Sequence, residues 1–270
     1  MKKNIVFIPF IKREENFTKA GVGKKGRTTG YEYGISSWRK WCEKNGHELV
    51  ILDTLLVPES EMLITWQRWK VLDILEHNEI EYDQVLVVDA DTIVHPDCPN
   101  FFEETDRKFC SVPSEGCYEW AGRAINGYSK MFFDCEDYIK IYEFFMTGFV
   151  IVNKDHKEFF DKVFAWYDEN QQEILDSYDK LQTGSDITLV NLLRKKFDVD
   201  IKYLPKQYSV EALSRKNLLY MEPQHYWGDT LKNLYNSGYV YQFNAIPANS
   251  LGRHREYWMK RIHTELWGDL

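Results

Sequence analysis

Residues 85–94 of this chain read VLVVDADTIV. Four aliphatic residues run into two aspartates, Asp89 and Asp91, and the chain then returns to apolar residues. A continuous run of valine and leucine is typical of a central strand that is covered on both faces. Open α/β sheets bind ligands beyond the carboxyl ends of their strands, which is where this aspartate pair falls. The stretch therefore predicts a buried strand that ends in a ligand site.

Two anionic oxygen ligands one residue apart suit a hard divalent cation. Mg²⁺ and Mn²⁺ are usually held by one or two carboxylates and shared with the phosphates of a substrate. Asp89 and Asp91 are thus candidate ligands of Mn²⁺ or Mg²⁺ and, through the metal, of a diphosphate. The alternative is an acidic turn after a strand, because short acidic strings are common.

The chain before this stretch predicts two β-α units. Residues 4–11 and 48–52 are rich in Ile, Val, Leu and Phe and read as strands. Helices are expected from Thr28 or Thr29 to about Asn45, and from Ser60 to about His77. This alternation favours an α/β fold with a mixed, mostly parallel central sheet and helices on both faces.

Beyond the aspartates the pattern is less regular. Helices are expected at 155–175 and 186–197, with a short strand at 201–204. Residues 113–144 break the alternation, and a long segment without obvious periodicity is often a binding loop or a lid. We assign it to an acceptor, with Tyr118 and Trp120 as stacking faces; a plain surface excursion is the alternative.

Composition excludes several classes of protein. The chain of 270 residues is 44% hydrophobic and shows no linker, which indicates one globular domain. Its net charge of -8 argues against sequence-independent nucleic-acid binding. The five cysteines show no C-x-x-C pairing and are expected to be free thiols. No run approaches 18 apolar residues, so we expect a soluble, cytoplasmic protein without a membrane partner.

Four pieces of the chain, spanning roughly residues 60 to 210, carry a resemblance. The stretch from Trp69 through Val94 resembles the signature of family 8 glycosyltransferases, the glycogenin and galactosyltransferase-like group with the GT-A fold. Residues 145–153 (FMTGFVIVN) are similar to its F-N-S-G-V strand, with Met146 and Thr147 in place of Asn and Ser. Residues 184–191 (GSDITLVN) resemble its D-Q-x-x-x-N helix, with Ile187 replacing the Gln, and residues 204–209 (LPKQYS) its L-P-x-x-Y-N turn.

The resemblance implies a single, Rossmann-like GT-A domain over 1–270, with a nucleotide-binding half (1–112) and an acceptor-binding half (113–270). It implies a metal-dependent transfer of sugar from a nucleotide sugar, UDP-sugar in the first place, to an unidentified acceptor, with retention. In the family the D-x-D holds Mn²⁺ against the diphosphate, and a lysine on the preceding helix reaches the nucleotide sugar. Lys70 matches that lysine.

Asp186 matches the aspartate of the family's helix and is the candidate catalytic residue. It would serve as general base in an inverting reaction, or as a positioning and charge-stabilising group in a retaining one. The alternative is a helix N-terminal residue favoured by the macrodipole.

The C-terminal part departs from the family. Gln242 falls where the family has a His that is the third metal ligand, and His254 is the other candidate for that role. Positive charge gathers nearby, and guanidinium groups fit phosphate oxygens well, so one or two of Arg253, Arg255, Lys260 and Arg261 are expected to bind the diphosphate. The residues expected to contact metal and donor are Phe10, Lys70, Asp89, Ala90, Asp91, Thr147, Gly148, Gln242, Asn244, Arg253, His254 and Lys260.

Two other functions compete for the central motif. A haloacid-dehalogenase-like phosphatase also uses D-x-D after a strand, with the first aspartate as nucleophile and Mg²⁺ bound. A sugar-nucleotide-binding protein without turnover is the second. A separate glycine pattern, Gly21-x-Gly23-x-x-Gly26, could cradle a phosphate, but the nine mostly polar residues 12–20 separate it from the first strand, which favours a flexible surface loop.

Overall fold

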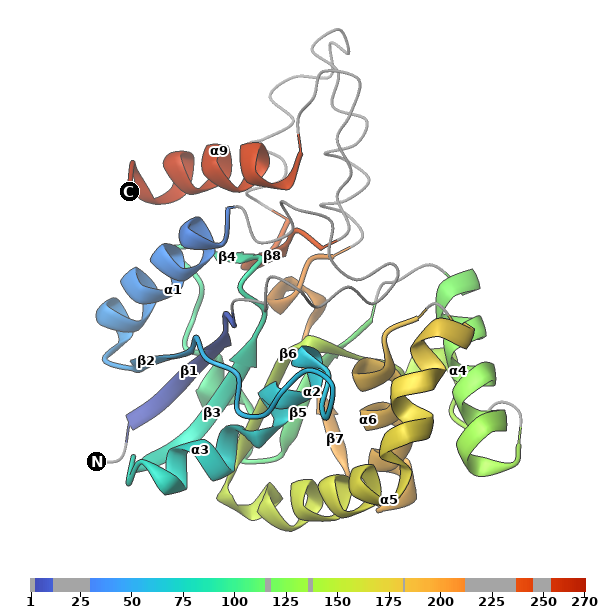
Figure 1. Ribbon diagram of the computed structural model, residues 1–270. Helices are drawn as coiled ribbons and strands as arrows, with labels where there is room; N and C mark the ends of the chain where they lie inside the picture. Colours follow the sequence, from blue (N-terminus) through green and yellow to red (C-terminus); the bar gives the residue numbers. More distant parts are fainter. Residues whose placement is uncertain are drawn as a thin grey trace, which may run out of the picture.

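The computed structural model describes residues 3–11, 30–114, 118–135, 138–181, 183–211, 237–244 and 254–270. Among these, the main sheet has six strands in the order β2-β1-β3-β6-β5-β7 (Figure 1). Their bounds are β1 Lys3–Pro9, β2 Glu48–Leu52, β3 Tyr82–Val88, β5 Phe109–Pro113, β6 Phe145–Asn153 and β7 Ile201–Tyr203. The glycine pattern at 21–26, the helix start at Thr28 or Thr29, and Arg253 lie outside the described residues.

The sheet is mixed and mostly parallel, as predicted. β1 pairs in parallel with β2 and β3, and β5 pairs in parallel with β7. β6 lies between β3 and β5 and runs antiparallel to both. A second sheet joins β4 (Thr92–Val94) to β8 (Val240–Gln242) in antiparallel fashion, so the C-terminal part of the chain returns to the D-x-D stretch.

Helices cover both faces of the main sheet (Figure 1). Their bounds are α1 Tyr31–Asn45, α2 Ile64–Gln67, α3 Val71–His77, α4 Tyr118–Phe133, α5 Lys157–Leu181, α6 Ser185–Lys196 and α9 Arg255–Trp267. Alternating residues of β3 serve the two faces: Leu86 and Val88 pack with α1, whereas Val85 and Val87 pack in the core that includes α3, α5 and α6. The buried aliphatic run is therefore a central strand, as its sequence predicts.

Most predicted elements occur within a few residues of their expected bounds. α1 ends at Gly46, whose φ of 71° is left-handed, as the glycine predicts. The helix expected from Ser60 is different. The amides of Glu61 and Met62 bind the carbonyl of Pro58 in a turn, and the helix then forms in three short pieces, with the 3-10 helix η1 (Arg68–Lys70) between α2 and α3.

Residues 113–144 are not the irregular loop that we predicted, because they contain the helix α4. Its buried positions follow a helical spacing of three and four residues. The helical period is therefore present in the sequence, and the glycines and aromatic residues of this segment hid it from the sequence analysis. The buried residues are Ala121, Ala124, Ile125, Tyr128 and Ser129.

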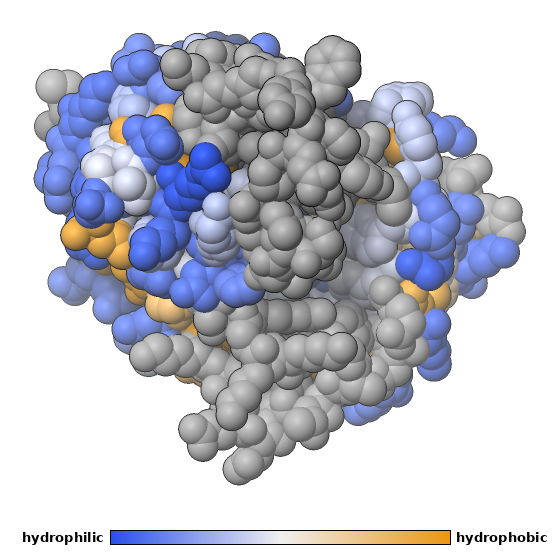
Figure 2. Space-filling model, turned by 90° about the horizontal axis from the view of Figure 1, so that it is seen from above, coloured by the Kyte–Doolittle hydropathy of each residue, from blue (hydrophilic) through white to orange (hydrophobic). Residues whose placement is uncertain are grey.

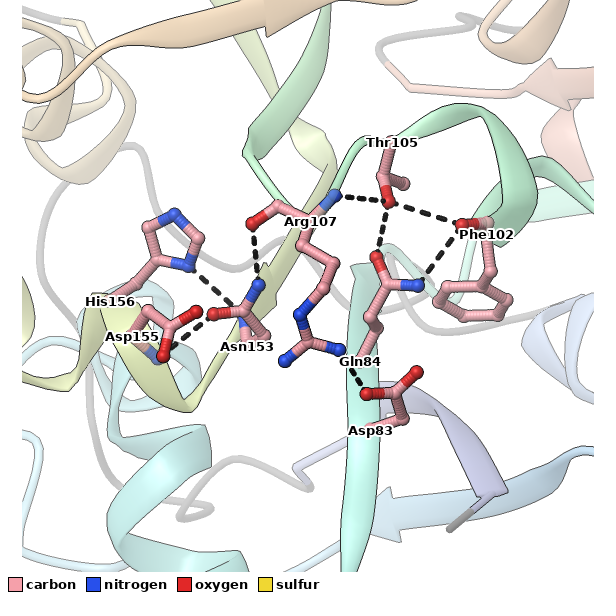
Figure 3. Close-up of polar contacts among 8 residues, drawn as sticks. All are labelled: Asp83, Gln84, Phe102, Thr105, Arg107, Asn153, Asp155 and His156. Atoms are coloured by element: carbon pink, nitrogen blue, oxygen red, sulfur yellow. Dashed lines mark hydrogen bonds and ion pairs between the residues drawn. The ribbon is translucent and has the colours of Figure 1, made fainter. Parts of the chain in front are cut away.

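A polar network joins strands at the edge of the sheet where β3 begins (Figure 3). Gln84 accepts a hydrogen bond from Thr105 at 2.5 Å and donates to the carbonyl of Phe102 at 3.0 Å. The side chain of Asn153, at the end of β6, donates to the carbonyl of Arg107 at 2.6 Å. The network therefore fixes the edge opposite the aspartates.

Two further features of the described residues concern the cysteines and the hydropathy of the helices. Cys42, Cys98, Cys110 and Cys135 are free thiols. In this part of the chain, no helix is both long enough and apolar enough to cross a membrane.

Candidate functional site

The two aspartates lie in the tight turn between β3 and β4, at the carboxyl end of β3. The Asp89 amide binds the carbonyl of Gly148 on β6 at 3.1 Å. The Thr92 hydroxyl donates to the carbonyl of Asp89 at 2.6 Å and accepts from the Trp38 indole at 2.8 Å. The turn is thus tied to β6 and to α1, which holds both carboxylates in place.

Two glycines let other backbones approach this turn closely. A Cβ atom on Gly34 of α1 would lie 2.3 Å from the carbonyl oxygen of Ala90. One on Gly148 would lie 2.6 Å from Oδ2 of Asp89 and 2.5 Å from Nε2 of Gln242. No larger residue fits at either position without a shift of the site.

Both oxygens of Asp89 have partners. Nη1 of Arg68 lies 2.5 Å from Oδ1, and Nε2 of Gln242 donates to Oδ2 at 3.2 Å. Burial alone would lower the pKa of Arg68, but the charges of Asp89, Asp186 and Asp91 outweigh it and raise that pKa. Arg68 is therefore a cation that pairs with Asp89 and is stabilised by the charges of Asp186 and Asp91.

Asp91 is less well satisfied. Nη1 of Arg255 lies 3.6 Å from its Oδ2. Its Oδ1 is buried and has no hydrogen-bond partner in the described structure. Burial, with a further contribution from the charge of Asp89, raises the pKa of Asp91 to about 7, although Arg255 and Arg68 oppose the shift. An additional cation would stabilise the ionised form of this carboxyl group.

Arg255 is the first residue of α9, which packs against α1. Its guanidinium lies 4.5 Å from the centre of the Tyr31 ring and donates to the Tyr31 hydroxyl at 3.2 Å. Phe10, a predicted donor contact, packs edge-to-face against Tyr31, with the ring centres 5.7 Å apart. The Nε atoms of Arg68 and Arg255 are both buried without a hydrogen-bond partner among the described residues.

Asp186 lies in the first turn of α6 and is buried. Burial raises its pKa, while Arg68 and a hydrogen bond with the Thr65 side chain oppose the shift. The Trp66 indole donates to the Ser185 hydroxyl at 2.9 Å, which ties α2 to the start of α6. Arg68 therefore connects the D-x-D pair electrostatically with Asp186.

The structure places Lys70 elsewhere. Its ammonium group lies 3.6 Å from the centre of the Phe164 ring and 3.5 Å from Asp73. Arg68, two residues earlier, is the basic residue that reaches Asp89, and the sequence analysis missed it. The predicted continuous helix over 60–77 could not show whether Arg68 or Lys70 points toward the aspartates. In the structure the helix breaks at η1, and the break changes the direction of the side chains.

The other predicted residues divide into two groups. Ala90, Thr147, Gly148 and Gln242 lie in or beside the D-x-D turn and are buried or in close contact. Asn244 donates to Glu211 at 3.0 Å, whereas Lys260 and His254 are exposed on α9 and at its N-cap. Within the described ranges, no three His, Cys, Asp or Glu side chains are grouped closely enough to hold a metal ion, so His254 is not brought together with the aspartates.

The face that carries this edge is mostly hydrophilic where it is described. Seen from above, apolar residues form only small, separate patches among polar ones (Figure 2).

Comparison with known structures identifies the architecture. A glycosyltransferase involved in glycosylation of the major capsid of PBCV-1 aligns over 96% of this chain and 99% of its own, with 10% identity and a TM-score of 0.55. The chain has a GT-A glycosyltransferase fold. The bifunctional glycosyltransferase WbbM aligns over 99% of this chain and 50% of its own, with 11% identity and a TM-score of 0.50.

The galactosyltransferase LgtC, in complex with donor and acceptor sugar analogs, is a further match, with 12% identity, coverage of 98% and 96% of the two chains, and a TM-score of 0.44. No protein-family model and no curated protein sequence matches the chain. The comparisons therefore establish the fold, and membership of family 8 stays a prediction.

Proposed function

We propose that this protein is a glycosyltransferase that transfers a sugar from a nucleotide sugar to an acceptor hydroxyl. The observation that carries the proposal is the set of unsatisfied buried atoms around the D-x-D turn. Among the described residues, Asp91 Oδ1 has no hydrogen-bond donor, and the Nε atoms of Arg68 and Arg255 have no acceptor. A divalent cation bound to a diphosphate would satisfy both kinds of atom.

The donor set supports such a cation. Asp89 and Asp91 would hold it, and the amide of Gln242 could contribute one neutral oxygen. Mn²⁺ or Mg²⁺ usually completes its coordination with water and substrate phosphates, so two carboxylates suffice from the protein. When bound, the ion would supply positive charge to the leaving diphosphate. The UDP moiety and retention follow from the family 8 resemblance and are part of the proposal.

The residues of this chain then divide the chemistry. The bond between the sugar and the diphosphate breaks with its electron pair on the diphosphate, through an oxocarbenium-like state. Arg68 and Arg255 would stabilise that charge, because guanidinium groups in a buried site interact strongly with phosphate oxygens. The acceptor oxygen bonds to the sugar carbon, and its proton passes to an oxygen of the departing diphosphate in a retaining reaction or to Asp186 in an inverting one. Asp186, buried beside Arg68, would orient the acceptor or stabilise the positive charge on the sugar.

A phosphatase that used Asp89 as nucleophile is less well supported. Arg68 contacts Oδ1 of Asp89 and Gln242 contacts Oδ2. Attack on phosphorus would turn this carboxylate into an uncharged acyl phosphate and weaken both contacts, whereas a metal ion can bind the remaining lone pairs and leave the carboxylate charged. The fold comparisons also weigh toward sugar transfer.

The test is release of nucleoside diphosphate from a panel of nucleotide sugars with Mn²⁺, for the wild type and for Asp186→Asn. We expect the wild type to hydrolyse one donor slowly. The family 8 resemblance predicts that this donor is a UDP-sugar. The variant should keep donor affinity and lose about 10²–10⁴-fold in turnover, as for loss of one positioned base. Thermal melting separates this result from unfolding. Release from no donor, together with cleavage of a simple phosphate ester, would contradict the proposal.

A further inference from the structure

The ion pair between Arg255 and Asp91 leaves polar atoms unsatisfied on both partners. The side chains are 14% and 12% exposed, yet the closest N–O distance is 3.6 Å. Charge-assisted hydrogen bonds are typically about 2.7–2.9 Å long. Asp91 Oδ1 and Arg255 Nε also lack hydrogen-bond partners in the described structure. Buried charges that are incompletely paired are costly, so this pair is poised for better partners.

Asp89 provides the contrast. Its two oxygens are held by Arg68 at 2.5 Å and by Gln242 at 3.2 Å. Arg255, in addition, has a second anchor that does not depend on Asp91, because its guanidinium lies on the Tyr31 ring and binds the Tyr31 hydroxyl. Arg255 can therefore leave Asp91 without leaving the site.

We propose that Arg255 is an exchangeable counter-ion of Asp91. In the free protein it neutralises Asp91; when a divalent cation binds Asp91, the guanidinium is displaced and takes an oxygen of the diphosphate instead. The inference rests on the proposed function, since it concerns the same cation and the same diphosphate. Two cations against one carboxylate repel each other, which drives the exchange, and the planar fork of Arg fits a phosphate better than a single long ion pair.

The exchange makes Arg255 oppose the metal alone and favour the metal together with diphosphate. Removing its charge should therefore move the two affinities in opposite directions. A residue that merely supports the fold would weaken both, and one that only binds diphosphate would leave the affinity for the metal alone unchanged. This difference in sign is the property to measure.

The experiment is calorimetric titration of the whole chain with Mn²⁺ alone, and then with UDP at saturating Mn²⁺. Arg255→Met is compared with the wild type and with Arg39→Met, which removes the same charge from an exposed position on α1. We expect Arg255→Met to bind Mn²⁺ roughly tenfold more tightly and UDP roughly tenfold more weakly, within the usual range of coupling between sites. Arg39→Met should match the wild type in both titrations.

Tyr31→Phe provides a second, milder variant in case Arg255→Met does not fold. It removes the hydroxyl that binds Nη1 but keeps the ring under the guanidinium. UDP affinity should fall in this variant, because the displaced guanidinium is less well positioned. Unchanged or weaker Mn²⁺ binding by Arg255→Met would overturn the exchange. If neither the wild type nor the variant binds Mn²⁺ or UDP, the proposed function itself fails.

Discussion

At the scale of single residues, Arg68 organises the charges of the site. It pairs with Asp89, and its pKa is raised by three carboxylates despite its burial. The position of Asp89 and Asp91 at the end of a central strand could be predicted from sequence, because a D-x-D after a buried strand is a local pattern. Arg68 could not, because Arg68-Trp69-Lys70 offers two cations and only the three-dimensional path of the chain decides between them.

Substitution of the two cations tests this assignment. Arg68→Met should lower UDP affinity in the presence of Mn²⁺ by about tenfold or more, because it removes a buried hydrogen-bonded charge beside the diphosphate. Lys70→Met should have little effect, because Lys70 contacts Asp73 and Phe164. Fluorescence or calorimetric titration measures both. A larger loss from Lys70→Met would favour the lysine that the resemblance indicates.

At the scale of elements, the close approach of β6 to the D-x-D turn depends on Gly148. Gly148→Ala would place a methyl group 2.6 Å from Asp89 Oδ2, and overpacking of this kind typically costs about 1–3 kcal/mol. We expect loss of nucleotide binding with a folded protein, because the clash falls on the side chains of Asp89 and Gln242 and not on the backbone. Gly122→Ala on α4 is the matched control, since nothing lies within 4 Å of its added methyl group. Equal binding by both variants would show that the turn can move without loss of function.

At the opposite edge of the sheet, His156 should make stability depend on pH. His156 accepts the amide hydrogen bond of Asn153 through Nδ1 at 3.1 Å, and burial lowers its pKa (Figure 3). The unfolded chain, with a histidine pKa of about 6.5, takes up a proton first as pH falls. Stability from this group is therefore complete above about pH 6.5 and is lost as pH falls from there through the lowered folded pKa.

His156→Gln removes this titration and keeps a possible acceptor. Thermal melting is measured between about pH 7.5 and about pH 5, which spans the titration range of histidine. The melting temperature should fall less for the variant than for the wild type. The remaining slope would combine two opposing contributions. The pKa values of His47, His95 and His263 are also lowered by burial, whereas those of Asp91 and Asp186 are raised and act in the opposite direction. Identical slopes in the two proteins would contradict the role assigned to His156.

The elements also show where sequence reasoning succeeds. β3, β1 and β2 were predictable because short, continuous aliphatic runs are typical of buried strands. α4 was missed although its buried residues recur every three or four positions, because the glycines and aromatic residues of that segment suggested a loop. The C-terminal return of β8 to β4, which brings Gln242 to Asp89, required the resemblance, since no local pattern indicates which strand pairs with which.

At the scale of the whole molecule, segments far apart in the chain meet at one edge of the sheet. β3, β6, β8, α1, α6 and α9 each contribute to it, and α9 lies against α1 beyond the ends of the strands (Figure 1). We propose that this edge binds a nucleoside diphosphate through a cation on Asp89 and Asp91.

Calorimetric titration with UDP tests that claim most directly, with Mn²⁺ and with a chelator, for the wild type, Asp89→Asn and Asp91→Asn. Asn keeps the size of each side chain and removes its charge. We predict measurable binding for the wild type with Mn²⁺, a loss of at least about tenfold with the chelator, and a similar loss in each variant with Mn²⁺. Equal UDP affinity with Mn²⁺ and with the chelator, in all three proteins, would contradict the claim.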